Sequence, residues 1–417
     1  MERYEIIGGK KLYGEVEIDS AKNSVLPIIA ASALVDGDVF INKCPKINDV
    51  ICLVDILKSI GAKAEFINGG LKINCDSLNN CEIGKDLAGE LRASVCMLGA
   101  LLSRFKKVKI AYPGGCSIGK RPIDIHVKCL KALGATVLEE DGYVECCANS
   151  LKGANITLDY PSVGATENAI LASVFAQGET VIFNCAREPE IKDFVDFLVK
   201  AGAKIYGAGT SVVSVVGVKR LKGVEFTPMS DRIEAGTFLI ATAVSGGEIC
   251  LKNCDFKNIL NLINKLANYT CKITKFNDII YIQSGKGGKP FSFSTGPYPL
   301  FPTDLQPQAS VLSCVSSGRS VISERVFENR FSHFEYLKKM GAIVDLDGSV
   351  AHVYGVRRLA GAHVCANDLR GGAALVLAGL NAEGLTIVDG AHHVKRGYNN
   401  FDEKLRALGA DIKLTEK

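Results

Sequence analysis

Apolar residues gather in runs that recur along the chain, and glycine-centred turns separate these runs. One kind of run consists of small apolar residues with few polar interruptions, and it predicts helices that are buried on every side. The predicted buried helices are Leu26–Leu34, Thr166–Ala176, Ala235–Val244 and Gly372–Leu380. A second kind of run follows a glycine and a polar residue, and it predicts a short strand. The predicted strands of this kind are Gly37–Ile41, Gly178–Ile182, Gly247–Leu251, Gly318–Ile322 and Gly384–Val388.

A phrase of the form Leu-x-x-x-Gly-Ala marks a predicted helix end in most parts of the chain. Its glycines are Gly61, Gly134, Gly202, Gly341 and Gly409. A glycine at this place supplies the left-handed cap of a helix, and a strand follows it. The spacing from Gly202 to Gly341 is about twice the other spacings, and Thr270 occupies the middle of a degenerate copy between them. The sequence therefore predicts six repeats of roughly seventy residues.

The strands that follow these helix ends complete the alternation of helices and strands. They are predicted at Ala62–Ile67, Ala135–Glu139, Ala203–Tyr206, Cys271–Phe276, Ala342–Asp347 and Ala410–Leu414. The strands that precede Lys22 are left over from the six repeats. We expect them to complete a sheet in one of the two halves.

Composition narrows the class of protein. With 417 residues, 47% of them hydrophobic, two domains are more probable than one. The net charge of +4 comes from mixed acids and bases without a basic run, so we expect no nucleic-acid partner. The N-terminus has no apolar signal region, and the longest apolar run, Val25–Val35, is too short to span a membrane.

Cysteine usage points to a reducing compartment. The chain has 15 cysteines, an odd number in a long sequence without a signal peptide, so we expect free thiols and a cytoplasmic location. No Cys-x2-Cys pair occurs, and a zinc site is therefore not expected.

The stretch Tyr112–His126 predicts a glycine-rich loop that leads into a helix starting at Pro122. Lys120 and Arg121 add two cations beside helix-start amides, which favour anions. Cys116 lies between the glycines, and a thiol among cations is biased toward the reactive thiolate. The plain alternative for this segment is a surface turn with an ordinary cysteine.

Motifs in this loop and elsewhere resemble one enzyme family along essentially the whole chain. Ala21-Lys22-Asn23 and Pro113-Gly-Gly-Cys116-x3-Lys-Arg-Pro122 are similar to the UDP-N-acetylglucosamine 1-carboxyvinyltransferases, the enolpyruvyl transferases of early peptidoglycan synthesis. Further matching motifs are Leu91–Ser94, Ser162–Thr166, Ala186–Glu190, Asp231–Thr237, Phe301–Gln306, Phe327–Phe331, Asp368–Arg370 and Arg396–Tyr398.

The resemblance implies a fold as well as a reaction. The fold is a two-domain inside-out α/β barrel of six βαβαββ repeats, three in each domain, with the active site in the cleft between the domains. The implied domains are residues 22–229, which carry the Cys116 loop, and residues 1–21 together with 230–417.

The implied reaction moves the enolpyruvyl group of phosphoenolpyruvate onto the 3'-hydroxyl of UDP-N-acetylglucosamine, through a tetrahedral ketal, with release of phosphate. The implied catalytic residues are Cys116, Asp304 and Lys22. Cys116 would act as the acid for the vinyl carbon and as the target of the epoxide fosfomycin, and Asp304 would act as the base or anchor for the hydroxyl. We expect no metal and no cofactor, because arginines and lysines would supply the positive charge.

The resemblance also implies the substrate contacts. For phosphoenolpyruvate they are Lys22, Asn23, Arg121, Arg370 and Arg396. For UDP-N-acetylglucosamine they are Asn23, Arg92, Arg121, Pro122, Ile123, Asp124, Ile125, Ser162, Val163, Gly164, Asp304 and Val326. Glu188 and Arg232 are expected to act behind the site or at a hinge, and His126 is either structural or a contact.

Two alternatives stay open at this point. One is a 5-enolpyruvylshikimate-3-phosphate synthase, which shares the implied fold and chemistry but whose opening Ser-Lys-Ser is replaced here by Ala21-Lys22-Asn23. The other is a noncatalytic nucleotide-sugar sensor on the same scaffold. Such a sensor would have no need to keep Cys116, Asp304 and the cations for phosphoenolpyruvate together. The oligomeric state is not indicated by the sequence.

Overall fold

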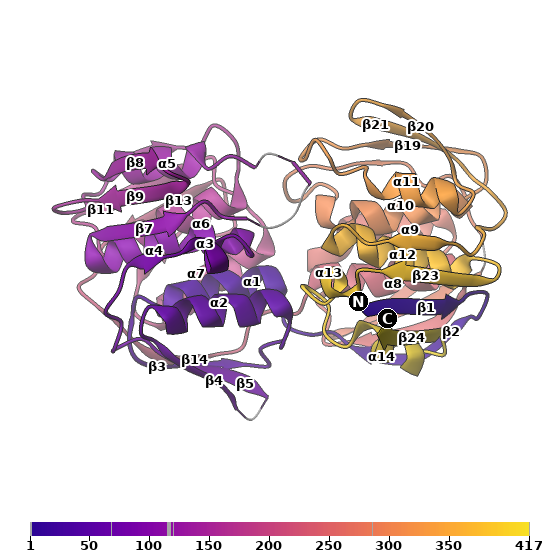
Figure 1. Ribbon diagram of the computed structural model, residues 1–417, viewed down its shortest axis with the longest axis horizontal. Helices are drawn as coiled ribbons and strands as arrows, with labels where there is room; N and C mark the ends of the chain where they lie inside the picture. Colours follow the sequence, from indigo (N-terminus) through magenta and orange to yellow (C-terminus); the bar gives the residue numbers. More distant parts are fainter. Residues whose placement is uncertain (1, 68, 115–117, 120, 286, 417) are drawn as a thin grey trace. The chain divides into compact units, whose positions relative to one another are not determined.

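The computed structural model describes residues 2–67, 69–114, 118–119, 121–285 and 287–416, which form two compact units (Figure 1). The first unit contains residues 20–114 and 121–229, and the second contains residues 2–19, 118–119 and 230–416. Each unit has its own core of buried apolar side chains. The chain changes unit after Asp19 and after Met229, and residues 118–119 belong to the second unit although the segments on both sides of them belong to the first.

The first unit holds three sheets of four strands each, and their orders are β14-β3-β5-β4, β6-β7-β9-β8 and β10-β11-β13-β12. Its strands are β3 (Val35–Asn42), β4 (Lys63–Ile67), β5 (Gly70–Asn74), β6 (Glu82–Ile83), β7 (Lys107–Ala111), β8 (Thr136–Glu140), β9 (Tyr143–Cys147), β10 (Asn155–Thr157), β11 (Glu179–Phe183), β12 (Lys204–Tyr206), β13 (Val212–Val216) and β14 (Leu221–Phe226). Its helices are α1 (Lys22–Ser32), α2 (Asn48–Ser59), α3 (Lys85–Ala88), η1 (Arg92–Val95), α4 (Cys96–Phe105), α5 (Asp124–Ala132), α6 (Val163–Ser173) and α7 (Pro189–Lys200), where η denotes a 3-10 helix.

The second unit repeats this arrangement with the sheet orders β16-β17-β15-β2, β18-β19-β21-β20 and β22-β23-β1-β24. Its strands are β1 (Glu2–Ile7), β2 (Leu12–Glu17), β15 (Gly247–Lys252), β16 (Lys272–Phe276), β17 (Ile279–Ser284), β18 (Phe293–Ser294), β19 (Arg319–Ser323), β20 (Ile343–Asp347), β21 (Val350–Tyr354), β22 (His363–Cys365), β23 (Leu385–Asp389) and β24 (Asp411–Glu416). Its helices are α8 (Arg232–Ser245), η2 (Phe256–Ile259), α9 (Leu260–Tyr269), η3 (Thr303–Leu305), α10 (Gln306–Val315), α11 (His333–Lys339), α12 (Leu369–Asn381), α13 (Ala391–Val394) and α14 (Phe401–Ala407).

All six sheets share one pairing pattern, in which a parallel pair of strands is extended by two antiparallel partners. In one example β15 pairs with β2 in parallel register, Gly247 opposite Leu12, and with β17 in antiparallel register. Both N-terminal strands complete sheets of the second unit, and β1 lies between β23 and β24 as an internal strand. The sixth repeat is therefore closed by the first residues of the chain.

The most apolar helices lie inside each unit, between its sheets (Figure 1). Every residue of α8 is buried, and so are residues 370–380 of α12. Because such helices are surrounded by other elements, they need no polar face. The predicted two-domain, inside-out α/β fold with six repeats is confirmed. No helix in the described part of the chain is both long and apolar enough to cross a membrane.

Left-handed residues end the helices where the repeated phrase predicts them. Gly202 has φ 112°, Gly341 has φ 91° and Gly409 has φ 95°. In the degenerate copy Thr270 takes the same conformation, with φ 111°, and caps α9 through its backbone N–H. A β-branched residue is strained in this region, since its Cβ crowds the neighbouring carbonyl group. The fifth repeat thus keeps the backbone of the others although it has lost the glycine.

Replacing Thr270 by glycine should stabilise the protein. The substitution relieves a left-handed β-branched residue, and we expect a gain of about 1 kcal/mol in the free energy of unfolding after the added flexibility of the unfolded chain is subtracted. The reverse change, Gly202→Thr, serves as the matched control, because nothing lies within 4 Å of a Cβ added there and only backbone strain would change. The melting temperature should rise for Thr270→Gly and fall for Gly202→Thr. A lower melting temperature for Thr270→Gly would contradict this account.

Candidate active site

In both units the predicted site residues cluster where the central helices begin. In the first unit these starts are Lys22 on α1, Arg92 on η1 directly before α4, and Ser162 before α6. In the second unit they are Arg232 on α8, Asp304 on η3 directly before α10, and Arg370 on α12. Helix starts present free N–H groups and favour anions. Each repeat therefore places a predicted site residue at the start of its central helix.

Lys22 is held by an ion pair inside the first unit. Its Nζ lies 2.6 Å from Oδ2 of Asp49 on α2, and the two side chains are 11% and 7% exposed. Asn23 follows Lys22 in the first turn of α1 and is partly exposed. A nearly buried lysine needs such a carboxylate to remain charged. Asp49 therefore sets the position of this cation.

Arg92 and Arg121 form a second cationic group in the first unit. Nη2 of Arg92 donates a hydrogen bond of 3.2 Å to the carbonyl oxygen of Pro122. Burial, and next the charge of Arg121, lower the pKa of Arg92 to about 10. Two close guanidinium groups repel each other, and a bound anion would relieve this repulsion. Helix α5 begins at Asp124, two residues after the predicted start at Pro122, because Ile123, with φ −108° and ψ 12°, is not yet helical.

His126 joins this group to the start of α6. Oδ1 of Asn168 accepts the Gly99 N–H at 2.7 Å, which fixes the orientation of the amide. Nδ2 of Asn168 therefore donates to Nδ1 of His126 at 2.7 Å, and the imidazole carries its proton on Nε2. Burial, and next the charges of Arg92 and Arg121, lower the pKa of His126 to about 3, so the ring is neutral.

The start of α6 approaches the imidazole closely. Ser162 caps the helix, and its Oγ accepts the Ala165 N–H at 3.3 Å. A Cβ added to Gly164 would lie 3.1 Å from Cε1 of His126, which favours glycine at this position. The structure thus brings Arg92, the segment Arg121–His126 and the segment Ser162–Gly164 together in one unit.

In the second unit Asp304 is clamped between two arginines. Its Oδ1 accepts a hydrogen bond of 3.0 Å from Nη2 of Arg330, and its Oδ2 accepts one of 3.1 Å from Nη2 of Arg370. The arginine side chains are 2% and 3% exposed, whereas that of Asp304 is 28% exposed. The carboxylate of Asp304 is therefore the part of this clamp that reaches the surface.

Two further carboxylates fix the parts of this clamp. Asp368 caps α12 by accepting the N–H groups of Arg370 and Gly371 at 3.0 Å, and it lies 3.7 Å from Nη1 of Arg330. Glu324 accepts the hydroxyl of Thr303 at 3.2 Å and the N–H of Val326 at 2.9 Å. The turn that carries Asp304 is therefore tied to the segment that carries Val326.

Arg370 keeps a donor available beside the clamp. Its Nη1 is buried and has no hydrogen-bond partner in the part of the chain that the structure describes. A buried donor without a partner is costly, and an anionic oxygen would satisfy it. Arg396 follows α13 and is partly exposed, and its charge helps to lower the pKa of His393, after burial and the charge of His392.

Cys116, the predicted acid, lies outside the described residues. Arg330 is the clamp residue that sequence reasoning did not assign to the site, although it belongs to the motif Phe327–Phe331. Asp49 was likewise not predicted as the partner of Lys22. Within the described ranges, no three His, Cys, Asp or Glu side chains come together as a metal-binding group.

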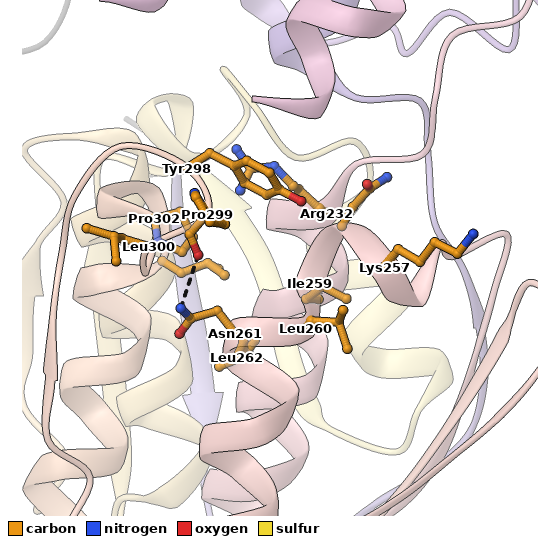
Figure 2. A pocket seen from close by; sticks show the side chains of 12 residues that line it. Arg232, Lys257, Ile259, Leu260, Asn261, Leu262, Tyr298, Pro299, Leu300 and Pro302 are labelled. Carbon is orange, nitrogen blue, oxygen red and sulfur yellow. Dashed lines mark hydrogen bonds between the residues drawn. The ribbon is translucent and has the colours of Figure 1, made fainter. Parts of the chain in front are cut away.

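A cavity of about 110 Å³ lies in the second unit beside the Asp304 turn (Figure 2). Pro302 and Leu305 line it from this turn, Tyr298 and Leu262 form further walls, and the guanidinium carbon of Arg232 lies 5.6 Å from the Tyr298 ring centroid. The amide of Asn261 donates a hydrogen bond of 3.1 Å to the Pro299 carbonyl oxygen. Asp304, Arg330 and Arg370 are not among the lining residues, so the cavity is separate from the clamp.

A buried acid lies below the start of α4. Oε2 of Glu167 accepts a hydrogen bond of 3.3 Å from the thiol of Cys96. Burial raises the pKa of Glu167 to about 8, and it raises that of Cys96 well above its usual value. Glu167 is therefore protonated at neutral pH in the folded protein. Neither residue was among the predicted site residues.

The chain matches known proteins over nearly its full length. Residues 6–405 match the family described as EPSP synthase (3-phosphoshikimate 1-carboxyvinyltransferase). The chain is 48% identical to UDP-N-acetylglucosamine 1-carboxyvinyltransferase 1 of Caldanaerobacter subterraneus over 96% of each chain. It is 46% identical to the Clostridium acetobutylicum protein of the same name over 100% of each. Among solved structures, the enolpyruvyl transferase NikO from Streptomyces tendae has a TM-score of 0.89 and 26% identity over 99% of each chain.

The raised pKa of Glu167 predicts a pH dependence of stability. The folded protein holds this proton up to about pH 8, whereas an unfolded glutamate loses it near the ordinary pKa of 4.5. Folding is therefore favoured most below pH 4.5, and stability falls as the pH rises toward 8, by up to about 1.4 kcal/mol per pH unit from this one group. Glu167→Gln should flatten this slope, as measured by thermal unfolding between pH 5 and pH 8. If the melting temperatures of both proteins changed with pH by the same amount, Glu167 would not hold the proton.

Proposed function

Because this chain belongs to the UDP-N-acetylglucosamine 1-carboxyvinyltransferases within the EPSP synthase family, we propose that it transfers the enolpyruvyl group of phosphoenolpyruvate to the 3'-hydroxyl of UDP-N-acetylglucosamine. Phosphate is released in the reaction, which is the first committed step of peptidoglycan synthesis. The identity of 46% over all 418 aligned residues with a relative of that name carries this proposal. We assign the enzyme to the cytoplasm, because the described cysteines are free thiols, as a reducing compartment keeps them.

The first-unit residues are assigned mainly to the nucleotide sugar. The helix starts of α5 and α6, together with Arg92 and Arg121, offer N–H groups and two guanidinium groups to a diphosphate. Asn23, Pro122–Ile125 and Ser162–Gly164 complete the proposed contacts. Lys22 is assigned to phosphoenolpyruvate, because its paired ammonium group can stabilise a developing negative charge.

The second-unit residues are assigned to the reacting groups. Asp304 accepts a hydrogen bond from Arg330 and one from Arg370, and its side chain is 28% exposed, which supports a role as acceptor of the sugar hydroxyl proton. Arg370 and Arg396 are assigned to the anionic oxygens of phosphoenolpyruvate, and Val326 to the sugar. Cys116 is proposed as the acid that protonates the vinyl carbon. In this division the functional domains are residues 22–229 and residues 1–21 with 230–417.

The proposed reaction is tested by phosphate release from phosphoenolpyruvate with two acceptors. Release that depends on UDP-N-acetylglucosamine supports the proposal. Release that depends on shikimate 3-phosphate would support the other branch of the family, which the description of the matched family makes the nearest alternative. Binding of the nucleotide sugar without any release would identify a noncatalytic sensor.

The role of Cys116 can be separated from that of an ordinary thiol. Cys116→Asp keeps an acid and removes the soft nucleophile, so it should retain turnover and resist fosfomycin. Cys116→Ser lacks a usable acid and should lose turnover by about 100-fold or more. Peptide mapping after fosfomycin treatment should find the adduct on Cys116. An adduct on buried Cys129 or another cysteine instead, with Cys116 unmodified, would remove Cys116 from the mechanism.

A further inference from the structure

Arg370 depends on a second contact to hold its orientation. Its Nη2 donates a hydrogen bond to Asp304, and its Nη1 has no hydrogen-bond partner among the described residues. A planar group anchored by one hydrogen bond can still rotate about it. The aromatic ring of Tyr398 supplies the second support, since the guanidinium carbon lies 5.3 Å from the ring centroid.

The hydroxyl of Tyr398 is part of a buried three-membered hydrogen-bond group with Thr237 and Gln308. Oη of Tyr398 lies 2.8 Å from Oγ1 of Thr237, and Nε2 of Gln308 donates to both oxygens, at 3.0 Å and 3.2 Å. Thr237 donates its own proton to the carbonyl oxygen of Ile233 at 2.8 Å.

These contacts leave one consistent arrangement of the protons. Because the Thr237 hydroxyl already donates to Ile233, the Tyr398 hydroxyl must be the donor to Thr237. The two N–H bonds of Gln308 then serve the two hydroxyl oxygens. Every proton in the group has a defined acceptor, and Oε1 of Gln308 is the polar atom of the group that has no partner among the described residues. Buried hydrogen-bond networks of this kind restrict the motion of their side chains. Thr237 and Gln308 are 0% exposed and Tyr398 is 2% exposed.

The group joins the beginnings of all three central helices of the second unit. Thr237 lies in the second turn of α8, Gln308 in the first turn of α10, and Arg370 in the first turn of α12. Tyr398 lies after α13 and also packs against Phe401, with ring centroids 4.7 Å apart. The hydroxyl of Tyr398 is thus held from α8 and α10, and its ring contacts the guanidinium group at the start of α12.

A tyrosine that only filled space in the core would not need a hydrogen-bonded hydroxyl such as that of Tyr398. Tyr269, another fully buried tyrosine of the same unit, packs against Phe291 with ring centroids 5.8 Å apart. Its Oη has no hydrogen-bond partner among the described residues. Tyr269 provides a matched control for the same chemical change away from Arg370.

We propose that Tyr398 is a positioning residue for Arg370, and that Thr237 and Gln308 act through it. The three side chains hold the guanidinium so that Nη2 stays on Asp304 while Nη1 remains directed to an anionic oxygen of phosphoenolpyruvate. This inference rests on the proposed function, because that function identifies the anion as phosphoenolpyruvate. The orientation of Arg370 itself can be tested without that function.

The kinetic test compares isosteric variants. Tyr398→Phe keeps the ring and removes the hydroxyl, and Thr237→Val removes the acceptor at nearly constant shape. Each should raise KM for phosphoenolpyruvate by about fivefold or more, the equivalent of one lost hydrogen bond, with a smaller change in KM for the nucleotide sugar. Thr237→Ser keeps the hydroxyl and Tyr269→Phe changes a tyrosine elsewhere, so both should stay within about twofold of the unsubstituted protein. In the double variant that combines Tyr398→Phe with Thr237→Val, KM for phosphoenolpyruvate should not exceed the higher of the two single-variant values.

A role in stability alone predicts a different pattern. The melting temperature would fall while both KM values stay constant, and this result would overturn the proposal. A change in KM for Tyr269→Phe equal to that for Tyr398→Phe would also overturn it. If another acceptor supports phosphate release, the same comparison is made with that acceptor, so failure of the proposed substrate is distinguished from failure of the positioning role.

A crystal structure of the Tyr398→Phe variant gives a readout that needs no activity. The distance between Nη2 of Arg370 and Oδ2 of Asp304, 3.1 Å here, should increase beyond hydrogen-bonding range or the guanidinium should adopt more than one orientation. An unchanged, single orientation of Arg370 in that variant would contradict the proposal.

Discussion

One carboxylate held between two buried arginines is the constraint on which the site of the second unit depends. Asp304 pairs with the buried guanidinium groups of both Arg330 and Arg370, and removing one partner from a buried ion pair costs several kcal/mol. Asp368 balances the second positive charge and at the same time begins α12. The same contacts that stabilise these helix starts leave Asp304 partly exposed. They also leave Nη1 of Arg370 without a partner among the described residues. The local fold and the proposed binding groups therefore depend on the same ion pairs.

The sixfold repeat explains why residues far apart in sequence serve one kind of chemistry. Each repeat contributes a central helix, and the segment that begins this helix carries site residues. Lys22, Arg92 and Ser162 occupy these starts in the first unit, and Arg370 occupies one in the second. The free N–H groups at such starts favour phosphates and carboxylates before any side chain is added. The structural repeat thus also repeats segments whose free N–H groups favour anions.

Most of the fold could be predicted because its signals are local. Glycines at helix ends and small apolar helices recur with a fixed spacing, and the sheets follow from them. A predicted helix began two residues too early at Pro122, because Ile123 is not yet in a helical conformation. The turn before β7 was missed, since Lys106 takes the left-handed conformation, with φ 60°, without a glycine to mark it. Arg330 and Asp49 were missed for another reason: ion pairs between distant segments leave no periodic trace, and only the surrounding motif indicated Arg330.

A double-mutant cycle on the clamp tests most directly whether Asp304 and its arginines act as one unit. The measurement is kcat/KM for phosphoenolpyruvate in Asp304→Asn, in Arg330→Lys and in the double variant. If the clamp is the constraint described here, the loss in the double variant should lie within about threefold of the loss in the more severe single variant, because the first substitution already breaks the unit. Losses that multiply would show that Asp304 and Arg330 act independently, and would contradict the account.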